Sequence, residues 1–213
     1  MKSTTYRKLN DIFLDAGMFG CVFAAVLCLL ELVGAALLGS DIDILDIGLN
    51  AWNAIFYLIV GNYFNKAKKG NAGLAINAVL ILTICNFILP IIINLFYGIL
   101  DSGLIGAISG LIANFIGTIF GVLFAIFLIL ELREHKKRKI TCLIVFGSLM
   151  FAVTLVLFIF NMINISAVIS SGIAVDAKSI VFYIVIPLVA YLSEFLFAFI
   201  YFYTPFYLKY LLR

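Results

Sequence analysis

Six long apolar stretches separated by short polar connections limit what this chain can fold into more than any other feature. They cover residues 16–39, 44–64, 72–100, 104–132, 140–163 and 180–208. A helix needs about 20 apolar residues to cross a hydrocarbon core roughly 30 Å thick. In lipid, each segment must pair its own backbone groups, which a helix does, and the alternating pattern of barrel strands is absent. The sequence therefore predicts an all-α polytopic membrane protein, a bundle of about six transmembrane helices.

Composition agrees with lipid as the solvent of this chain. Hydrophobic residues make up 65% of it and charged residues 12%, and the mean hydropathy is +1.23. A soluble domain carries about 25% charged residues. The connections are too short to fold alone, so residues 1–213 are predicted to form a single transmembrane domain. No nucleic-acid partner is expected, and Lys and Ile usage favours a bacterial cytoplasmic membrane.

The basic residues predict the orientation of the bundle. Thirteen of the fourteen Lys and Arg residues lie at the two chain ends and in the second and fourth connections. Lys178 is the single cation of the odd-numbered connections, which together with Asp46 at the start of the second stretch carry five Asp residues. Because positive charge collects on the cytoplasmic side, both termini are predicted to be cytoplasmic.

A weak internal similarity relates the two halves of the chain. At a shift of 100 residues, seven positions match, from Ile12 with Ile112 to Leu32 with Leu132. The third and sixth stretches each contain one central proline, Pro90 and Pro187. Three spans per half would invert the second half, so the pattern suggests a weak 3+3 inverted repeat. Each proline removes one backbone hydrogen bond and clashes with the preceding turn, so both helices are expected to kink at mid-membrane.

Polar side chains recur along one face of most of the predicted helices, and two of them are carboxylates. A charge at the bilayer centre costs at least about 2.5–3.5 kcal/mol. The apolar stretches contain no Lys, Arg or His that could pair with Glu31 or Glu194. We therefore expect these groups to face a polar, outward-open pocket. The predicted substrate-binding residues are Glu31, Asn53, Asn86, Asn94, Asn114, Tyr191 and Glu194.

Motifs for catalysis and cofactor binding are absent from the sequence. There is no phosphate-binding loop, no HExxH pattern, and one histidine, His135, outside the apolar stretches. The four cysteines lie inside apolar stretches without the CxxC spacing of a metal site. We therefore expect a protein that is not an enzyme and has no catalytic residues, metal site or cofactor.

Two functions from different classes fit these features. The first is binding or transport of a small solute, and the acidic character of the pocket favours a cationic, amine-bearing or proton-coupled one. The second is a non-transporting accessory, assembly or immunity-type membrane protein. In that case the polar faces hold helices together, since side-chain bonds between membrane helices contribute about 0.6 kcal/mol each.

The connection Arg133–Lys139 is the densest basic run of the chain. It either contacts anionic lipid head groups or docks a cytoplasmic or membrane partner subunit. The layout resembles that of six-span substrate-binding subunits of vitamin transporters and six-span permease subunits of ATP-driven exporters. Both work with a separate ATPase, so the likeness, which is one of layout alone, implies an ATPase as a possible partner.

Overall fold

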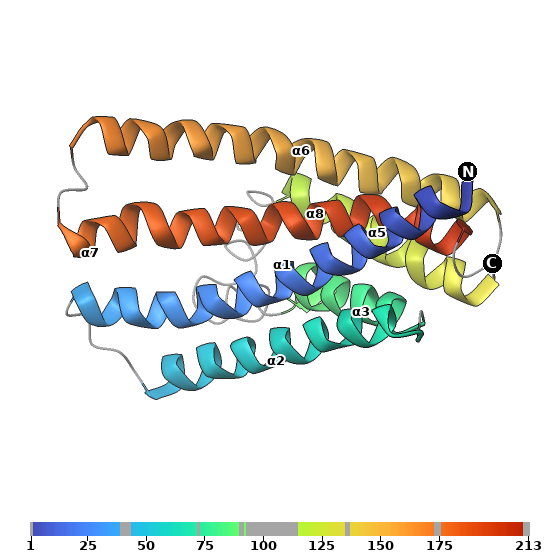
Figure 1. Ribbon diagram of the computed structural model, residues 1–213, viewed down its shortest axis with the longest axis horizontal. Coiled ribbons are helices and arrows are strands. Elements are labelled where there is room, and N and C mark those ends of the chain that lie inside the picture. The colour runs from blue at the N-terminus through green and yellow to red at the C-terminus, as the bar shows by residue number, and fades with distance from the viewer. Residues whose placement is uncertain are drawn as a thin grey trace.

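The computed structural model describes residues 2–38, 44–71, 73–89, 92, 115–134, 137–172 and 176–210, and within these ranges it contains only helices and turns (Figure 1). This confirms the all-α prediction for the described part of the chain. The elements are α1 (Lys2–Leu38), α2 (Ile44–Lys68), α3 (Gly73–Thr83), η1 (Ile84–Ile88), α5 (Phe115–Glu134), α6 (Lys137–Ser170), α7 (Ala177–Ile180), η2 (Val181–Val185) and α8 (Ile186–Tyr210).

Three helical runs in the described residues are long and apolar enough to cross a membrane. They are Lys8–Leu37, Ile140–Ser170 and Ala177–Lys209, and Gly73–Ile88 is a shorter apolar helix. At 1.5 Å per residue, each of the three exceeds the thickness of a hydrocarbon core. Helix α2 has 25 residues, but its four asparagines lower its hydropathy. The fold is therefore that of a helical membrane protein.

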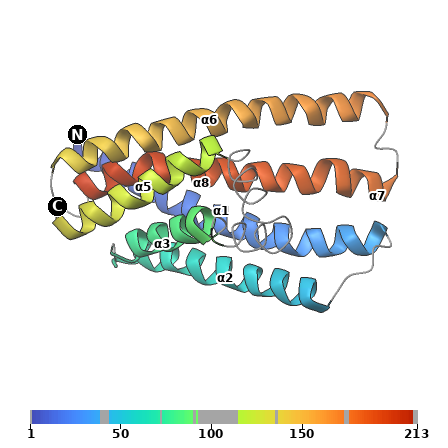
Figure 2. The ribbon, with the colours of Figure 1, turned by 180° about the vertical axis from the view of Figure 1, so that it is seen from behind.

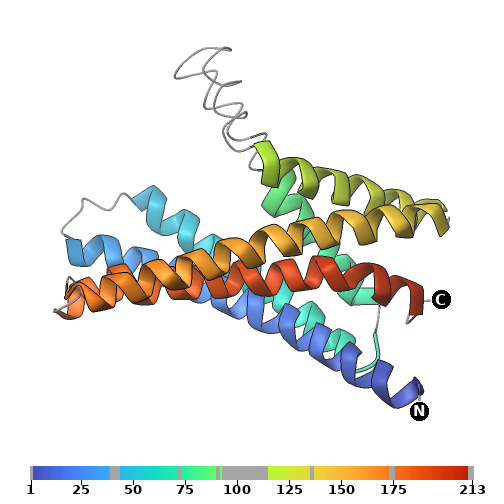
Figure 3. The same ribbon diagram turned by 90° about the horizontal axis from the view of Figure 1, so that it is seen from above.

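The helices are arranged around the bundle in their order along the chain. Helix α1 packs against α2 and α8, α8 against α6, α6 against α5, and α3 against both α2 and α5. Seen from behind and from above, α5 lies beside α6 and on the other side of the bundle from α1 (Figures 2 and 3). An inverted repeat would place the first segment beside the fourth, so this order does not confirm the predicted repeat.

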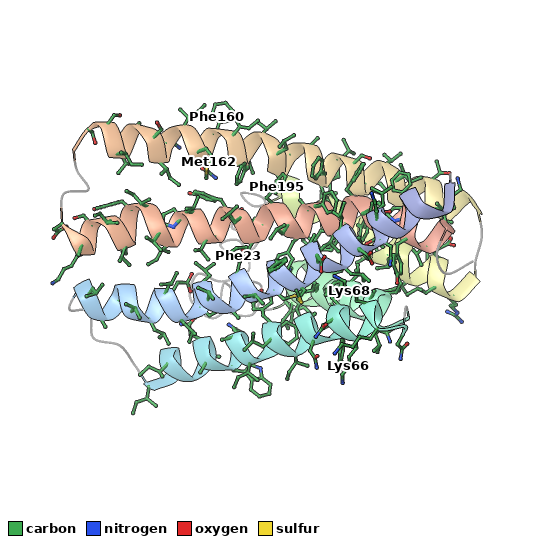
Figure 4. The ribbon with its side chains drawn as sticks, viewed as in Figure 1. Phe23, Lys66, Lys68, Phe160, Met162 and Phe195 are labelled. Atoms are coloured by element: carbon green, nitrogen blue, oxygen red, sulfur yellow. The ribbon has the colours of Figure 1, made fainter. Side chains whose placement is uncertain are left out.

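One end of the bundle collects the basic residues, and we call it the basic end. Helix α1 begins there and α8 ends there (Figure 1). Lys66 and Lys68 project from α2 at this end (Figure 4). Arg133 lies in the last turn of α5 and Lys209 in the last turn of α8. The opposite end, where α1 ends and α7 begins, is called the far end.

The hydrophobic core occupies the half of the bundle next to the basic end. Phe13 packs there between Tyr207, at a ring-centroid distance of 4.9 Å, and Phe64, at 6.2 Å. Phe195 of α8 packs against Phe151 and Phe158 of α6. Phe160 instead points away from the bundle (Figure 4) and is exposed. Large apolar side chains exposed in this way are suited to contact with lipid.

Both central prolines follow a π-helical turn. The turn η1 ends two residues before Pro90, and η2 ends two residues before Pro187. In η1 the Leu89 N–H donates to the Ile84 carbonyl, and in η2 the Ile186 N–H donates to the Val181 carbonyl. A π turn is one way for a helix to continue past an interruption of its hydrogen bonding. Pro187 lies within α8, whereas Pro90 lies outside the described residues.

Candidate functional site

A group of polar side chains meets in the middle of the bundle, where α2, η1 and α8 come together. The Tyr57 hydroxyl of α2 donates a hydrogen bond of 3.2 Å to Asn86 Oδ1 of η1. The Tyr57 ring stacks on Phe197 of α8 at a centroid distance of 6.1 Å. Asn86 is half-buried. The hydrogen bond therefore joins the second and third apolar segments, and the ring contact adds the sixth.

Tyr201 of α8 completes this group, which we call the central cluster: Tyr57, Thr83, Asn86 and Tyr201. Its side chain interacts with those of Asn86 and Thr83. Even so, the geometry around the Tyr201 hydroxyl satisfies no hydrogen bond to any described residue. The Thr83 hydroxyl donates to the Val79 carbonyl at 2.6 Å. The central cluster thus holds an incompletely satisfied polar group inside the bundle.

Glu194 lies on the same face of α8 as Tyr201 of the central cluster, closer to the far end. Seven residues separate Glu194 from Tyr201, and positions seven apart share a helix face. Tyr201 is buried, whereas Glu194 is exposed. Two helical turns correspond to about 10 Å. Glu194 therefore lies about 10 Å closer to the far end, on a helix face that is closed deeper in the bundle.

Glu31 shows the same relation on α1. Ala24, seven residues earlier on the same face, and Cys28 are both buried, whereas Glu31 is exposed. Gly34 of α1 lies close to Ile186 of α8, and Gly20 lies close to Leu196. These antiparallel contacts place Glu31 nearer to the far end than Glu194. Both carboxylates thus stand above the buried half of the bundle.

The other predicted binding residues are only partly placed. Asn53 lies one turn from Tyr57 on α2 and is exposed, and Tyr191 of α8 is half-buried. Asn94 and Asn114 lie outside the described residues. The structure joins Asn86 to Tyr57, and the grouping of all seven residues around one pocket stays a prediction.

A separate cavity of about 230 Å³ lies at the far end of α1, and no predicted binding residue lines it. Its lining residues are Gly34, Leu37, Asp176, Lys178, Ser179, Val181, Phe182 and Tyr183. Asp176 caps α7 by accepting a 2.8 Å hydrogen bond from the Ser179 N–H. Hydrogen bonds from the hydroxyl and N–H of Ser179 lower the pKa of the Asp176 carboxyl. This carboxylate is thus committed to its helix terminus.

Sequence reasoning did not count three members of the central cluster as site residues. Tyr57, Thr83 and Tyr201 lie on the same polar faces as the predicted residues, so periodicity alone was enough to include them. Glu131 lies at the end of the fourth stretch, beside the basic run, and this position predicts a residue at the membrane interface. The structure instead buries its side chain, which is 1% exposed.

The fold and the central cluster are those of an all-helical membrane protein with polar groups buried inside the bundle. Comparisons with protein-family models, with curated proteins and with solved structures found no match.

Proposed function

We propose that the chain binds or transports a small cationic or amine-bearing solute through a polar pocket that opens at the far end. One observation supports this most: Glu31 and Glu194 are exposed although positions two turns deeper on the same helix faces are buried. A carboxylate at such a depth needs a cavity, a proton or a cation. In the proposed pocket, between the central cluster and the far end, the carboxylates have a cavity and can bind a cation.

The proposal includes a topology. The chain crosses the membrane six times as a single domain in a bacterial cytoplasmic membrane, with the basic end in the cytoplasm. The pocket then opens to the outside, and the packed half closes it on the cytoplasmic side. The run Arg133–Lys139 begins in the last turn of α5 with Arg133, and it would dock an energy-supplying partner such as an ATPase.

Substitution of each carboxylate tests the proposal. Purified Glu31→Gln and Glu194→Gln proteins keep their shape and lose one negative charge. A panel of small primary and quaternary amines should raise the thermal midpoint of the wild type in detergent and should not raise that of either variant. Uptake of the stabilising amine into proteoliposomes should fall at least about tenfold in Glu194→Gln, the cost of one lost charged contact.

Asp11→Asn is the matched control, because it removes a carboxylate near the basic end of α1. It should leave amine binding unchanged. Wild-type binding and uptake of an amine that persist in both glutamine variants would overturn the proposal.

The accessory-protein function is supported by a different observation. Tyr57 bonds Asn86, and the Ser193 and Thr204 hydroxyls donate to backbone carbonyls of their own helix, so several polar groups already have structural partners. If this function holds, Glu194→Gln lowers folding yield in detergent and no amine stabilises the wild type.

A further inference from the structure

The Tyr201 hydroxyl is a polar group that packing alone does not explain. Tyr201 is 2% exposed, and its ring lies 5.4 Å from both Phe87 and Phe124. Its hydroxyl interacts with the Asn86 and Thr83 side chains, but the geometry with any described residue does not satisfy a hydrogen bond. A phenylalanine would fill the same space without leaving a buried polar group unsatisfied. The hydroxyl is therefore suited to a ligand rather than to the fold.

The groups around this hydroxyl offer mainly oxygen lone pairs. The Tyr57 proton is committed to Asn86 Oδ1, and the Thr83 proton is committed to the Val79 carbonyl. Their oxygens can therefore only accept further interactions. Thr83 is fully buried, which leaves no room at this position for the body of an organic solute.

The π turn η1 begins directly after Thr83 and contains Asn86, so the central cluster lies at an irregular turn of its helix. Carbonyls released at helix interruptions coordinate sodium ions in membrane transporters. Glu194 lies about 10 Å away along the same face of α8, between the central cluster and the far end.

We propose that the central cluster binds one sodium ion through the side-chain oxygens of Tyr201, Asn86 and Thr83. The ion would lie below the solute pocket, on the closed side of the bundle. Binding of the ion does not depend on the proposed function, whereas its use to drive solute uptake does. The inference therefore adds an ion site, and through it a source of energy, to a function that otherwise needs a partner.

Thermal unfolding of the full-length protein in detergent tests the site without any solute. We expect a higher midpoint in sodium chloride than in an equal concentration of choline chloride, because an ion that binds only the folded state stabilises it. Tyr201→Phe should match or exceed the wild-type midpoint in choline chloride, since it removes an unsatisfied group, and should lose the sodium-dependent increase. A residue with a purely structural role would lower the midpoint in both salts.

Two further variants keep the test decisive. Asn86→Asp adds a negative charge in nearly the same shape and should tighten apparent sodium affinity about tenfold. Tyr203→Phe, a matched control on the same helix, removes a hydroxyl outside the central cluster and should keep the sodium-dependent increase. The site is rejected if sodium and choline give equal midpoints in the wild type, or if Tyr201→Phe keeps the increase.

The two proposals fail separately. A sodium-dependent increase in a protein that moves no amine retains the ion site and removes transport. Amine uptake that is equal in sodium and choline media, and unchanged by Tyr201→Phe, retains transport and removes the ion site.

Discussion

An ion pair between Lys68 and Asp15 joins α2 and α1 at the basic end. Lys68 Nζ donates to both carboxylate oxygens of Asp15, at 2.9 and 3.0 Å. The two side chains are 43% and 37% exposed, so solvent weakens the interaction. The hydrogen bond to Asp15, followed by the negative charges of Asp15 and Asp11, raises the pKa of Lys68.

The direction of this shift fixes its pH dependence. Because the pKa of Lys68 is higher in the folded state, the pair stabilises the protein fully below the unfolded-state pKa of lysine, about 10.4. That contribution is lost as pH rises through the folded-state value. Asp15→Asn should therefore lower the thermal midpoint slightly at neutral pH, and the difference should disappear in the alkaline range. Lys66→Gln is the control; an unchanged difference for Asp15→Asn above the lysine titration would contradict the assignment.

At this scale the sequence predicted part of the central cluster. The polar face of the third stretch identified Asn86, because an amide at that depth avoids lipid. The choice of partner did not follow from periodicity. Whether Asn86 meets Tyr57, Tyr201 or both depends on the rotation of three helices about their axes. A seven-residue spacing defines a helix face but not the neighbour of that face.

Close helix contacts depend on single glycines. A Cβ atom at Gly147 of α6 would lie 2.7 Å from the Tyr201 carbonyl oxygen and 3.3 Å from Phe202 Cα. Both are backbone atoms, which cannot rotate away as a side chain can. Small residues permit this approach between membrane helices. Gly147 therefore sets the distance between α6 and the part of α8 that carries Tyr201.

Alanine at this position should separate the two helices. We expect Gly147→Ala to destabilise the folded protein by about 1–3 kcal/mol, as overpacking does. Gly48→Ala is the matched control, because a Cβ atom at Gly48 of α2 meets nothing within 4 Å. It should stabilise by up to about 1 kcal/mol, since alanine is the better helix former. Thermal or denaturant unfolding in detergent measures both, and equal effects of the two substitutions would contradict the contact.

The two central prolines show which feature of a helix the local sequence predicts and which it does not. Their missing N–H groups predict an interrupted ladder in the third and sixth stretches. The structure resolves the interruption before Pro187 as the five-residue turn η2. A kink, a π turn and an inserted water all accommodate a proline, and the choice depends on the packing of neighbouring helices, which the local sequence does not contain.

The apolar stretches of the sequence correctly predicted a helical molecule, but their number differs from the number of described helices that meet the criteria for a membrane span. The described helices supply three runs of spanning length and hydropathy, whereas six apolar stretches occur in the sequence. Helix α2 shows the difficulty: Asn50, Asn53, Asn62 and Asn65 lower its hydropathy, although its length is sufficient. Asn50 and Asn65 are half-buried, whereas Asn53 and Asn62 are exposed.

Reporter fusions decide between six crossings and fewer. A reporter that is active only in the cytoplasm should be active when fused after Lys68 or Lys136. A reporter that is active only outside should be active after Asp43, Asp101 or Ser171. The argument is electrostatic: each proposed cytoplasmic connection holds at least three basic residues, and such clusters are retained on the cytoplasmic side during insertion. As a control, replacing Lys66, Lys68 and Lys69 with glutamine should weaken the orientation signal at that connection alone. A cytoplasmic signal after Ser171 would place both ends of α6 on one side of the membrane and would exclude the six-span topology, together with the outward-open pocket that depends on it.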